Sequence, residues 1–381
     1  MSISIGVVGK PNAGKSTLFS ALTMADAKIA PFPFTTIEPN RAVAYIRKPC
    51  PHTEIGKQCT PRDSSCVQGT RFIPIQITDV AGLVPDAHLG RGLGLQFLDD
   101  IRQADALIQV VDASGRTDLE GNPSEGSDPS LEVEFLEKEM THWIAGILER
   151  NWNKVSGRPA SALYDLFSSM KIGHAHVEAA VRKLGLAETL NWKQEERLAF
   201  ADEMRKVKPV LVAANKWDSA SGTKRLMERY AGRVVKCASA YELALRKAAK
   251  AGAIEYTPGA GEFKIANATE EQRRALSTID AYMKVNGSTG VQQVLEQVVN
   301  GTLGLVAVYP VEDEHKWSDR KGNVLPNVFL LPKGSTALQV AERVHTDLAK
   351  NFISAVDARR KLRIGKDYII NDGDIMRIIS G

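Results

Sequence analysis

The chain has 381 residues, of which 43% are hydrophobic and 25% charged, and its formal net charge is +4. This composition is typical of a folded globular protein of two or three domains and excludes a disordered or collagen-like chain. It contains no apolar run of about 20 residues and no signal-type N-terminal segment, so we expect a cytoplasmic protein with no membrane partner. Four cysteines are too few for a secreted disulfide scaffold.

The N-terminal residues predict a strand and a helix joined by a glycine-rich loop. The strand "ISIGVVG" is followed by Gly9-x4-Gly14-Lys15-Ser16, which matches the P-loop pattern, and the helix then begins. In such a loop backbone N–H groups surround a polyphosphate, Lys15 reaches the β and γ phosphates, and the Ser16 hydroxyl binds Mg²⁺. The predicted nucleotide-binding residues are Gly9, Asn12, Ala13, Gly14, Lys15, Ser16 and Thr17.

Further strands are predicted along the chain, at 40–46, 70–82, 104–114, 207–218 and 233–240. The runs at 104–114 and 207–218 are almost continuously apolar, as in parallel strands that are buried on both faces. We therefore expect an α/β domain with a mostly parallel sheet, helices on both faces, and a ligand site at the carboxyl ends of the strands.

Two other regions differ in character from this domain. Residues 115–206 carry helix signals, including a helix that opens at Asp128 and Pro129 and places Leu131, Phe135, Ile144 and Leu148 on related faces. From about 304 onward, strands and one helix over 337–352 predict a small α+β module. The expected domains are 1–114 with 207–302, a helical insertion at 115–206, and a C-terminal module at 303–381.

The segment "NKWD" follows an apolar strand and predicts the base that is bound. The Asp218 carboxylate can accept hydrogen bonds from N1–H and the 2-amino group of guanine, whereas adenine lacks both donors. Asn215 would support the loop, and the stem of Lys216 would cover the purine. Ser239 and the Ala240 N–H in "CASA" would face the base oxygen. Together these residues predict GTP rather than ATP.

Other residues are candidates for catalysis. Asp79 at a strand end would hold Mg²⁺ through water, Thr36 would be its second protein ligand beside Ser16, and the Gly82 N–H would meet the γ-phosphate. Lys15, Thr36, Gly82 and His88 are therefore the predicted catalytic residues. For His88 a solvated loop histidine is the alternative, and for Arg91 the choice lies between an arginine finger and a solvated side chain. Leu83 stands where Ras-like enzymes place a water-orienting glutamine, so we expect slow intrinsic turnover.

These motifs in this order resemble the Obg superfamily of translation-factor-class GTPases, and specifically its YchF-like branch. The resemblance rests on "GKPNAGKST", "PFPFTTIEPN", "DVAGLV", "GRGLGLQFLDDIRQADALIQVVDAS", "NKWD" and "DGDIMRIIS". It implies a G domain with a helical insertion, a C-terminal TGS domain of the ubiquitin-like β-grasp type, and the ribosome as a partner. Asn12 is similar to the asparagine of potassium-activated GTPases, which implies K⁺ beside the phosphates; a loop-stabilising asparagine is the alternative. Many YchF-like proteins have an altered base motif and are linked to ATP, whereas the intact "NKWD" favours GTP and the archaeal and eukaryotic-type branch.

Two features remain outside this scheme. Cys50, His52, Cys59 and Cys66 could hold structural Zn²⁺, although their spacing lacks a paired C-x₂₋₄-C; free thiols and a disulfide are the alternatives.

Basic residues gather at 224–250 and 359–366 and would contact RNA phosphates, unless they form ordinary solvated faces. We see no RNP-type signature and expect no base-specific reading of RNA and no reading of DNA sequence. The leading hypothesis is a Mg²⁺-dependent GTPase switch on ribosomes or RNA; the alternatives are a P-loop ATPase and an RNA-binding scaffold with negligible turnover.

Overall fold

A computed structural model describes residues 3–24, 40–80 and 100–381. The chain forms two compact units, which we treat separately. The first comprises Met1–Met24, Ile37–Ala42 and Gln76–Val294, and the second Ala25–Thr36, Val43–Ile75 and Leu295–Gly381. The predictions made for Thr36, Gly82, Leu83, His88 and Arg91 lie outside the described residues.

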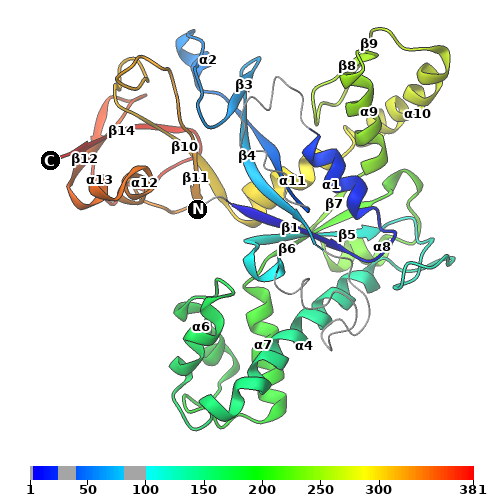
Figure 1. Cartoon of the computed structure of the whole chain (residues 1–381), viewed down its shortest axis with the longest axis vertical. Coiled ribbons are helices and arrows are strands. Elements are labelled where there is room, and N and C mark those ends of the chain that lie inside the picture. The colour runs from blue at the N-terminus through cyan, green and yellow to red at the C-terminus, as the bar shows by residue number, and fades with distance from the viewer. Residues whose placement is uncertain (1–2, 25–39, 81–99) are drawn as a thin grey trace. The chain divides into compact units, whose positions relative to one another are not determined.

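The main sheet has seven strands and is mostly parallel, as predicted (Figure 1). Its order is β2-β4-β1-β5-β6-β7, and β3 pairs with β4 in antiparallel fashion. The pairs β1–β4, β1–β5, β5–β6 and β6–β7 are all parallel. The strands are β1 (Ser4–Gly9), β2 (Arg41–Pro49), β3 (Ser65–Val67), β4 (Thr70–Asp79), β5 (Ala106–Asp112), β6 (Val210–Asn215) and β7 (Val234–Lys236). All residues of β5 and β6 are buried, which explains their continuous apolar character.

Helices of the first unit follow the strands in the order expected. Outside the insertion they are α1 (Lys15–Thr23), α8 (Lys224–Arg229), α9 (Ser239–Lys250), α10 (Glu270–Asn286) and α11 (Val291–Glu296), and a two-stranded ribbon of β8 (Ile254–Glu255) and β9 (Lys264–Ile265) lies between α9 and α10. α1 packs on α9. The predicted strand at 233–240 is shorter than expected, because α9 already begins at Ser239.

Residues between β5 and β6 form four helices, as the sequence predicts for this region. They are α4 (Ser130–Val155), α5 (Leu163–Ser168), α6 (His174–Leu184) and α7 (Gln194–Lys206). α4 and α7 pack side by side (Figure 1) around a core that includes Leu136, Phe167 and Phe200. The expectation that Leu131 belongs to the buried face is wrong, since this side chain is 41% exposed. The first buried apolar residue of α4 is instead Val133.

The C-terminal part of the second unit is a five-stranded mixed sheet with one main helix against it. The strand order is β11-β10-β14-β12-β13, with β10 and β14 parallel and the other pairs antiparallel. The strands are β10 (Leu305–Val311), β11 (Phe329–Pro332), β12 (Phe352–Asp357), β13 (Leu362–Ile364) and β14 (Asp374–Ser380). A six-residue π-helical segment, Gln297–Thr302, precedes them.

The single helix predicted over 337–352 is two helices, α12 (Ala337–Val344) and α13 (Thr346–Lys350). His345 has an extended backbone with φ −164°, and its Nδ1 accepts a hydrogen bond from the Asp347 N–H at 3.2 Å. The histidine therefore ends one helix and caps the next. Val340 of α12 packs with Val308, Ala355 and Met376 of the sheet.

None of the helices in the described ranges is long and apolar enough to cross a membrane.

Candidate nucleotide-binding site

The strand register brings the predicted polar residues to one edge of the parallel sheet. Val7 lies opposite Asp79, Asp112 opposite Asn215, and Ala214 opposite Lys236. Val7 lies two residues before the end of β1, and each of the other residues stands at or next to the carboxyl end of its strand. This is the edge at which open α/β sheets bind ligands.

The loop between β1 and α1 has the backbone conformation of an anion-binding turn. Asn12 and Gly14 have φ angles of +62° and +91°. A Cβ atom on Gly14 would lie 2.2 Å from the Asn215 Nδ2, so only glycine fits there. The first helical turn, which contains Lys15, Ser16 and Thr17, directs N–H groups without intrahelical acceptors toward the loop.

Lys15 and Asp79 form an ion pair across this loop, with 2.6 Å between Nζ and Oδ1. Both side chains are largely buried, at 14% and 17% exposure. The pair places the cation predicted to meet phosphates beside the carboxylate predicted to hold Mg²⁺. The Ser16 hydroxyl, on the next residue, is exposed.

Asn215 connects the loop to the predicted base-binding segment. Its Nδ2 donates to the Ala13 carbonyl at 2.9 Å, and its Oδ1 accepts from the Ser239 N–H at 3.0 Å. The residue is 3% exposed. Asn215 therefore links the Ala13 carbonyl to the Ser239 N–H, and its role toward the nucleotide stays a prediction.

Lys216 has a left-handed backbone with φ +59°, and its Nζ lies 2.8 Å from Asp112 Oδ2. Burial alone would raise the pKa of Asp112, but Lys216 and the hydroxyls of Ser114 and Thr117 outweigh it and lower that pKa. Asp112 therefore stays ionised and anchors the Lys216 side chain. Sequence reasoning missed this partner, although a carboxylate at a strand end was the available signal.

Asp218 lies in a short turn, Trp217–Ser219, with its side chain exposed. Its charge acts on buried neighbours, since it adds to the burial that raises the pKa of Tyr241 and that of Cys237, the latter to about 12. Ser239 is fully buried and its N–H is bonded to Asn215, whereas Ala240 is exposed in the first turn of α9.

A second loop, residues 115–127, packs against the P-loop. The Asn12 Nδ2 donates to the Gly121 carbonyl at 3.0 Å. The Lys10 Nζ donates to the Thr117 and Asp118 carbonyls at 2.7 Å each and lies 3.0 Å from Glu132 Oε1. The contact made by Asn12 is the one expected of a loop-stabilising asparagine, and its role toward K⁺ stays a prediction.

The pairing of Lys10 with Glu132 was missed by sequence reasoning. Lys10 is only 4% exposed, and Glu132 is 5% exposed. Burial raises the pKa of Glu132 to about 7, even though the Lys10 charge opposes this rise. A lysine directly after an apolar strand was the one local signal that could have indicated a buried cation.

Several arginines of the two basic segments form ion pairs within the chain. Arg225 and Arg229 contact Glu134 at 2.7 Å and 2.6 Å, and Arg359 contacts Glu54 at 2.7 Å. Arg246 is buried and paired with Glu242. The contact of these basic segments with RNA stays a prediction. The other predicted cluster, of Cys50, His52, Cys59 and Cys66, does come together in the second unit.

The fold and this geometry define a P-loop nucleotide-binding protein. Residues 4–144 match the family model of the 50S ribosome-binding GTPases, residues 213–313 that of the Obg-like GTPase YGR210-like, G4 motif-containing domain, and residues 320–380 the TGS domain.

Relatives extend this match to the whole chain. An uncharacterised GTP-binding protein of Methanocaldococcus jannaschii is 46% identical, over 99% of this chain and 98% of its own. The ribosome-binding ATPase YchF of Escherichia coli O157:H7 is 27% identical, over 100% of this chain and 99% of its own. The crystal structure of a GTP-binding protein from Pyrococcus horikoshii OT3 superposes with a TM-score of 0.81 at 41% identity and covers 100% of both chains. The chain belongs to the Obg-like, YchF-related family of GTP-binding proteins, and the resemblance seen in its motifs is confirmed.

Proposed function

We propose that this protein binds GTP and hydrolyses it slowly, with Mg²⁺, to GDP and phosphate, and that it acts in the cytoplasm as a nucleotide-dependent switch on ribosomes. The observation that carries the proposal is the position of Asn215, which joins the P-loop at Ala13 to the base-reading loop at Ser239. A phosphate-binding loop and a guanine-reading segment held together in this way favour a guanine nucleotide. In this proposal residues 115–206 are an insertion in the G domain, and the TGS domain follows it.

Each residue has a distinct role in the proposed reaction. Lys15 stabilises charge on the β and γ phosphates, and releasing it from Asp79 frees that carboxylate to position Mg²⁺ through water. Ser16 and Thr36 are the proposed Mg²⁺ ligands, and Gly82 and His88 the proposed groups near the γ-phosphate. Bound Mg²⁺ supplies charge neutralisation for phosphoryl transfer.

ATP is the competing nucleotide, because the relatives include proteins named ATPase as well as GTP-binding protein. The intact Asp218 and its exposed carboxylate favour guanine. We expect Asp218→Asn to exchange guanine preference for xanthine preference, because an amide can donate to the 2-oxygen of xanthine. A competition titration with GTP, xanthosine triphosphate and ATP measures this. Unchanged selectivity in the variant, or ATP displacing GTP at equal concentration, would contradict the assignment.

The proposal also names the ribosome as the binding partner of this protein. Support comes from the name of the Escherichia coli relative, a ribosome-binding ATPase. Cosedimentation with ribosomes in GTP and in GDP tests the switch, and phosphate release with and without ribosomes and K⁺ tests the turnover. Lys15→Ala should abolish hydrolysis in either condition. Nucleotide-dependent binding to ribosomes without any phosphate release would favour the scaffold alternative.

A further inference from the structure

The loop between β2 and β4 has little core of its own. It contains a short helix, α2 (His52–Ile55), and the β3–β4 hairpin. Gln68 and Gly69, with φ angles of +49° and +80°, make a two-residue turn in that hairpin. The Cys50 N–H donates to the Gly69 carbonyl at 2.7 Å, so the beginning of the loop is tied to its end. Long connections of this kind usually need an additional constraint.

Four side chains with metal-ligand chemistry meet inside this loop. Cys50 lies after β2, His52 at the start of α2, Cys59 beyond α2, and Cys66 on β3. Their ligand atoms all lie within 4.8 Å of one another. Cys50, His52 and Cys59 are buried, and Cys66 is half-buried.

The separations agree with the edges of a tetrahedron around zinc. The Cys50 and Cys59 Sγ atoms are 3.7 Å apart, and the Cys66 Sγ is 3.6 Å from the His52 Nδ1. With Zn–S bonds of about 2.3 Å and Zn–N bonds of about 2.0 Å, tetrahedral geometry requires about 3.8 Å between sulfurs and about 3.5 Å between sulfur and nitrogen. Three cysteines and one histidine are an established ligand set for structural zinc.

A buried cation lies beside this cluster. Arg71 pairs in register with Cys66 and is 0% exposed. Its Nη2 donates to the Leu325 carbonyl, but within the described ranges its Nε and Nη1 have no hydrogen-bond partner. Burial raises the pKa of the nearby Asp63, and the charge of Arg71 opposes this rise. Zinc with three thiolates and a neutral histidine has a formal charge of about −1, which this guanidinium would balance.

A disulfide explains the arrangement less well. A disulfide between Cys50 and Cys59 needs about 2.0 Å between the sulfurs, far less than the observed separation, and would use neither Cys66 nor His52. A single metal ion, in contrast, would use all three thiols and the imidazole as ligands. All four tetrahedral positions are taken by protein side chains, so the site is of the closed, structural type.

We propose that Cys50, His52, Cys59 and Cys66 form a structural Zn²⁺ site that holds the β2–β4 loop against residues 324–326 of the same unit, which precede β11. The Thr60 and Arg62 N–H groups donate to the Val324 and Pro326 carbonyls at 2.9 Å and 2.8 Å. These donors directly follow Cys59, so fixing Cys59 fixes both contacts.

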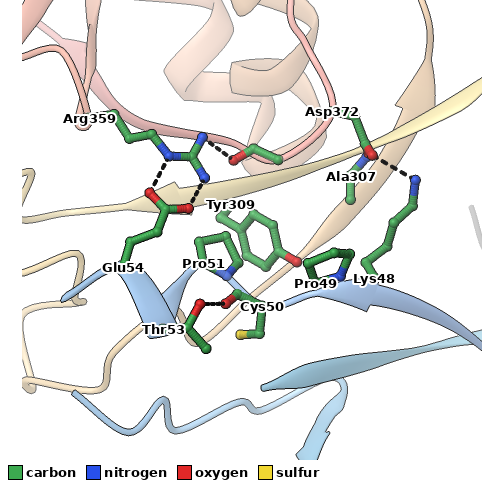
Figure 2. A pocket seen from close by; sticks show the side chains of 11 residues that line it. Lys48, Pro49, Cys50, Pro51, Thr53, Glu54, Ala307, Tyr309, Arg359 and Asp372 are labelled. Carbon is green, nitrogen blue, oxygen red and sulfur yellow. Dashed lines mark hydrogen bonds and ion pairs between the residues drawn. The ribbon is translucent and has the colours of Figure 1, made fainter. Parts of the chain in front are cut away.

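Two ion pairs join the first part of this region, at Lys48 and Glu54, to C-terminal residues of the same unit. Glu54 pairs with Arg359 at 2.7 Å and Lys48 with Asp372 at 2.8 Å, on either side of Cys50, and the Tyr309 ring lies beside Cys50 and its neighbouring prolines (Figure 2). Loss of the metal would free the loop while the ion pairs remain, because they lie outside the ligand set.

The test is the metal content of the full chain purified under reducing conditions from zinc-supplemented medium. We expect about one zinc per chain by mass spectrometry, and about a tenth or less in Cys59→Ser. Cys237→Ala is the matched control, since Cys237 is also a buried cysteine but lies outside the cluster, and it should keep the zinc. Cobalt substitution of the wild type should give thiolate charge-transfer and tetrahedral d–d bands, and His52→Cys should shift these bands while metal is retained.

A second experiment uses only the wild-type chain, so its result does not depend on whether the variants fold. Chelation should increase amide hydrogen exchange at 59–67 and 324–326, and leave α4 unchanged. Wild-type chain without zinc after supplementation and reconstitution, with all four thiols titratable, would overturn the proposal. So would a Cys50–Cys59 disulfide found by mass spectrometry in that chain.

Discussion

Asn215 illustrates how single polar atoms organise the nucleotide site. Its amide satisfies one carbonyl and one N–H from two different loops. Because the residue is buried, removing the amide leaves both partners unpaired, and each unpaired buried group costs about 1–3 kcal/mol.

We expect Asn215→Ala to lower the free energy of unfolding by about 2–4 kcal/mol and to weaken GTP binding. Denaturant titration and nucleotide titration measure the two effects. Asn286→Ala, which removes an exposed amide at the end of α10, is the control and should change stability by less than about 1 kcal/mol. Equal losses of stability in the two variants would show that the two hydrogen bonds of Asn215 are not the cause of the loss.

Glu132 should make stability depend on pH. Its pKa rises from 4.5 to about 7 on folding, so between these values the folded chain binds a proton that the unfolded chain has lost. The contribution of this group to the free energy of unfolding therefore falls as pH rises through this window, by at most about 3 kcal/mol, and is constant above it.

Denaturant titrations from pH 5 to pH 8 measure this dependence. Glu132→Gln should remove the decrease, because the amide does not titrate. Glu134→Gln, on the same helix but paired with exposed arginines, should retain it. An identical pH profile in wild type and Glu132→Gln would refute the assignment.

At the scale of elements, the helices between β5 and β6 share one hydrophobic cluster with residues of the sheet, among them Val8, Leu107 and Val210. Phe200 of α7 is fully buried, and its ring centroid lies 4.9 Å from that of Trp192 and 5.9 Å from that of Phe167. The three aromatic rings all lie between β5 and β6, on the side of the cluster formed by the insertion, so we expect a cavity at Phe200 to leave the carboxyl edge of the sheet in place.

Phe200→Ala should destabilise the chain by about 3–5 kcal/mol through the cavity that it creates. Leu198→Ala, on the same helix but 40% exposed, should cost less than about 0.5 kcal/mol. Thermal unfolding measures both changes, and GTP affinity at low temperature should be unchanged in both. Weaker GTP binding in Phe200→Ala would mean that the insertion and the nucleotide site are coupled.

The sequence predicted helices and strands correctly where a single local pattern determines the type of element. The apolar runs of β5 and β6 sufficed to locate those strands. Prediction failed at Leu131 and His345, because spacing alone does not say which side of a helix meets a neighbour, or where a polar side chain caps a new helix.

At the scale of the whole molecule, a bound nucleotide should stabilise the fold by mass action. GDP with Mg²⁺ at about 100 times its dissociation constant should add about 2.7 kcal/mol to the free energy of unfolding, while the same concentration of ATP adds little. The melting temperature with each nucleotide measures this. Asp218→Asn should lose the effect of GDP, and stabilisation by ATP alone would contradict the guanine assignment.

The sequence by itself determined the position of the P-loop, the mostly parallel character of the sheet that follows it and the family, because each depends on contiguous residues whose spacing has one structural meaning. Only the tertiary structure decided that Asn215 meets Ala13, that Lys10 meets Glu132, that several arginines of the basic segments form ion pairs, and that Cys50, His52, Cys59 and Cys66 converge. These contacts join residues that are separated along the chain, and their formation depends on how strands and helices pack, which no local pattern encodes.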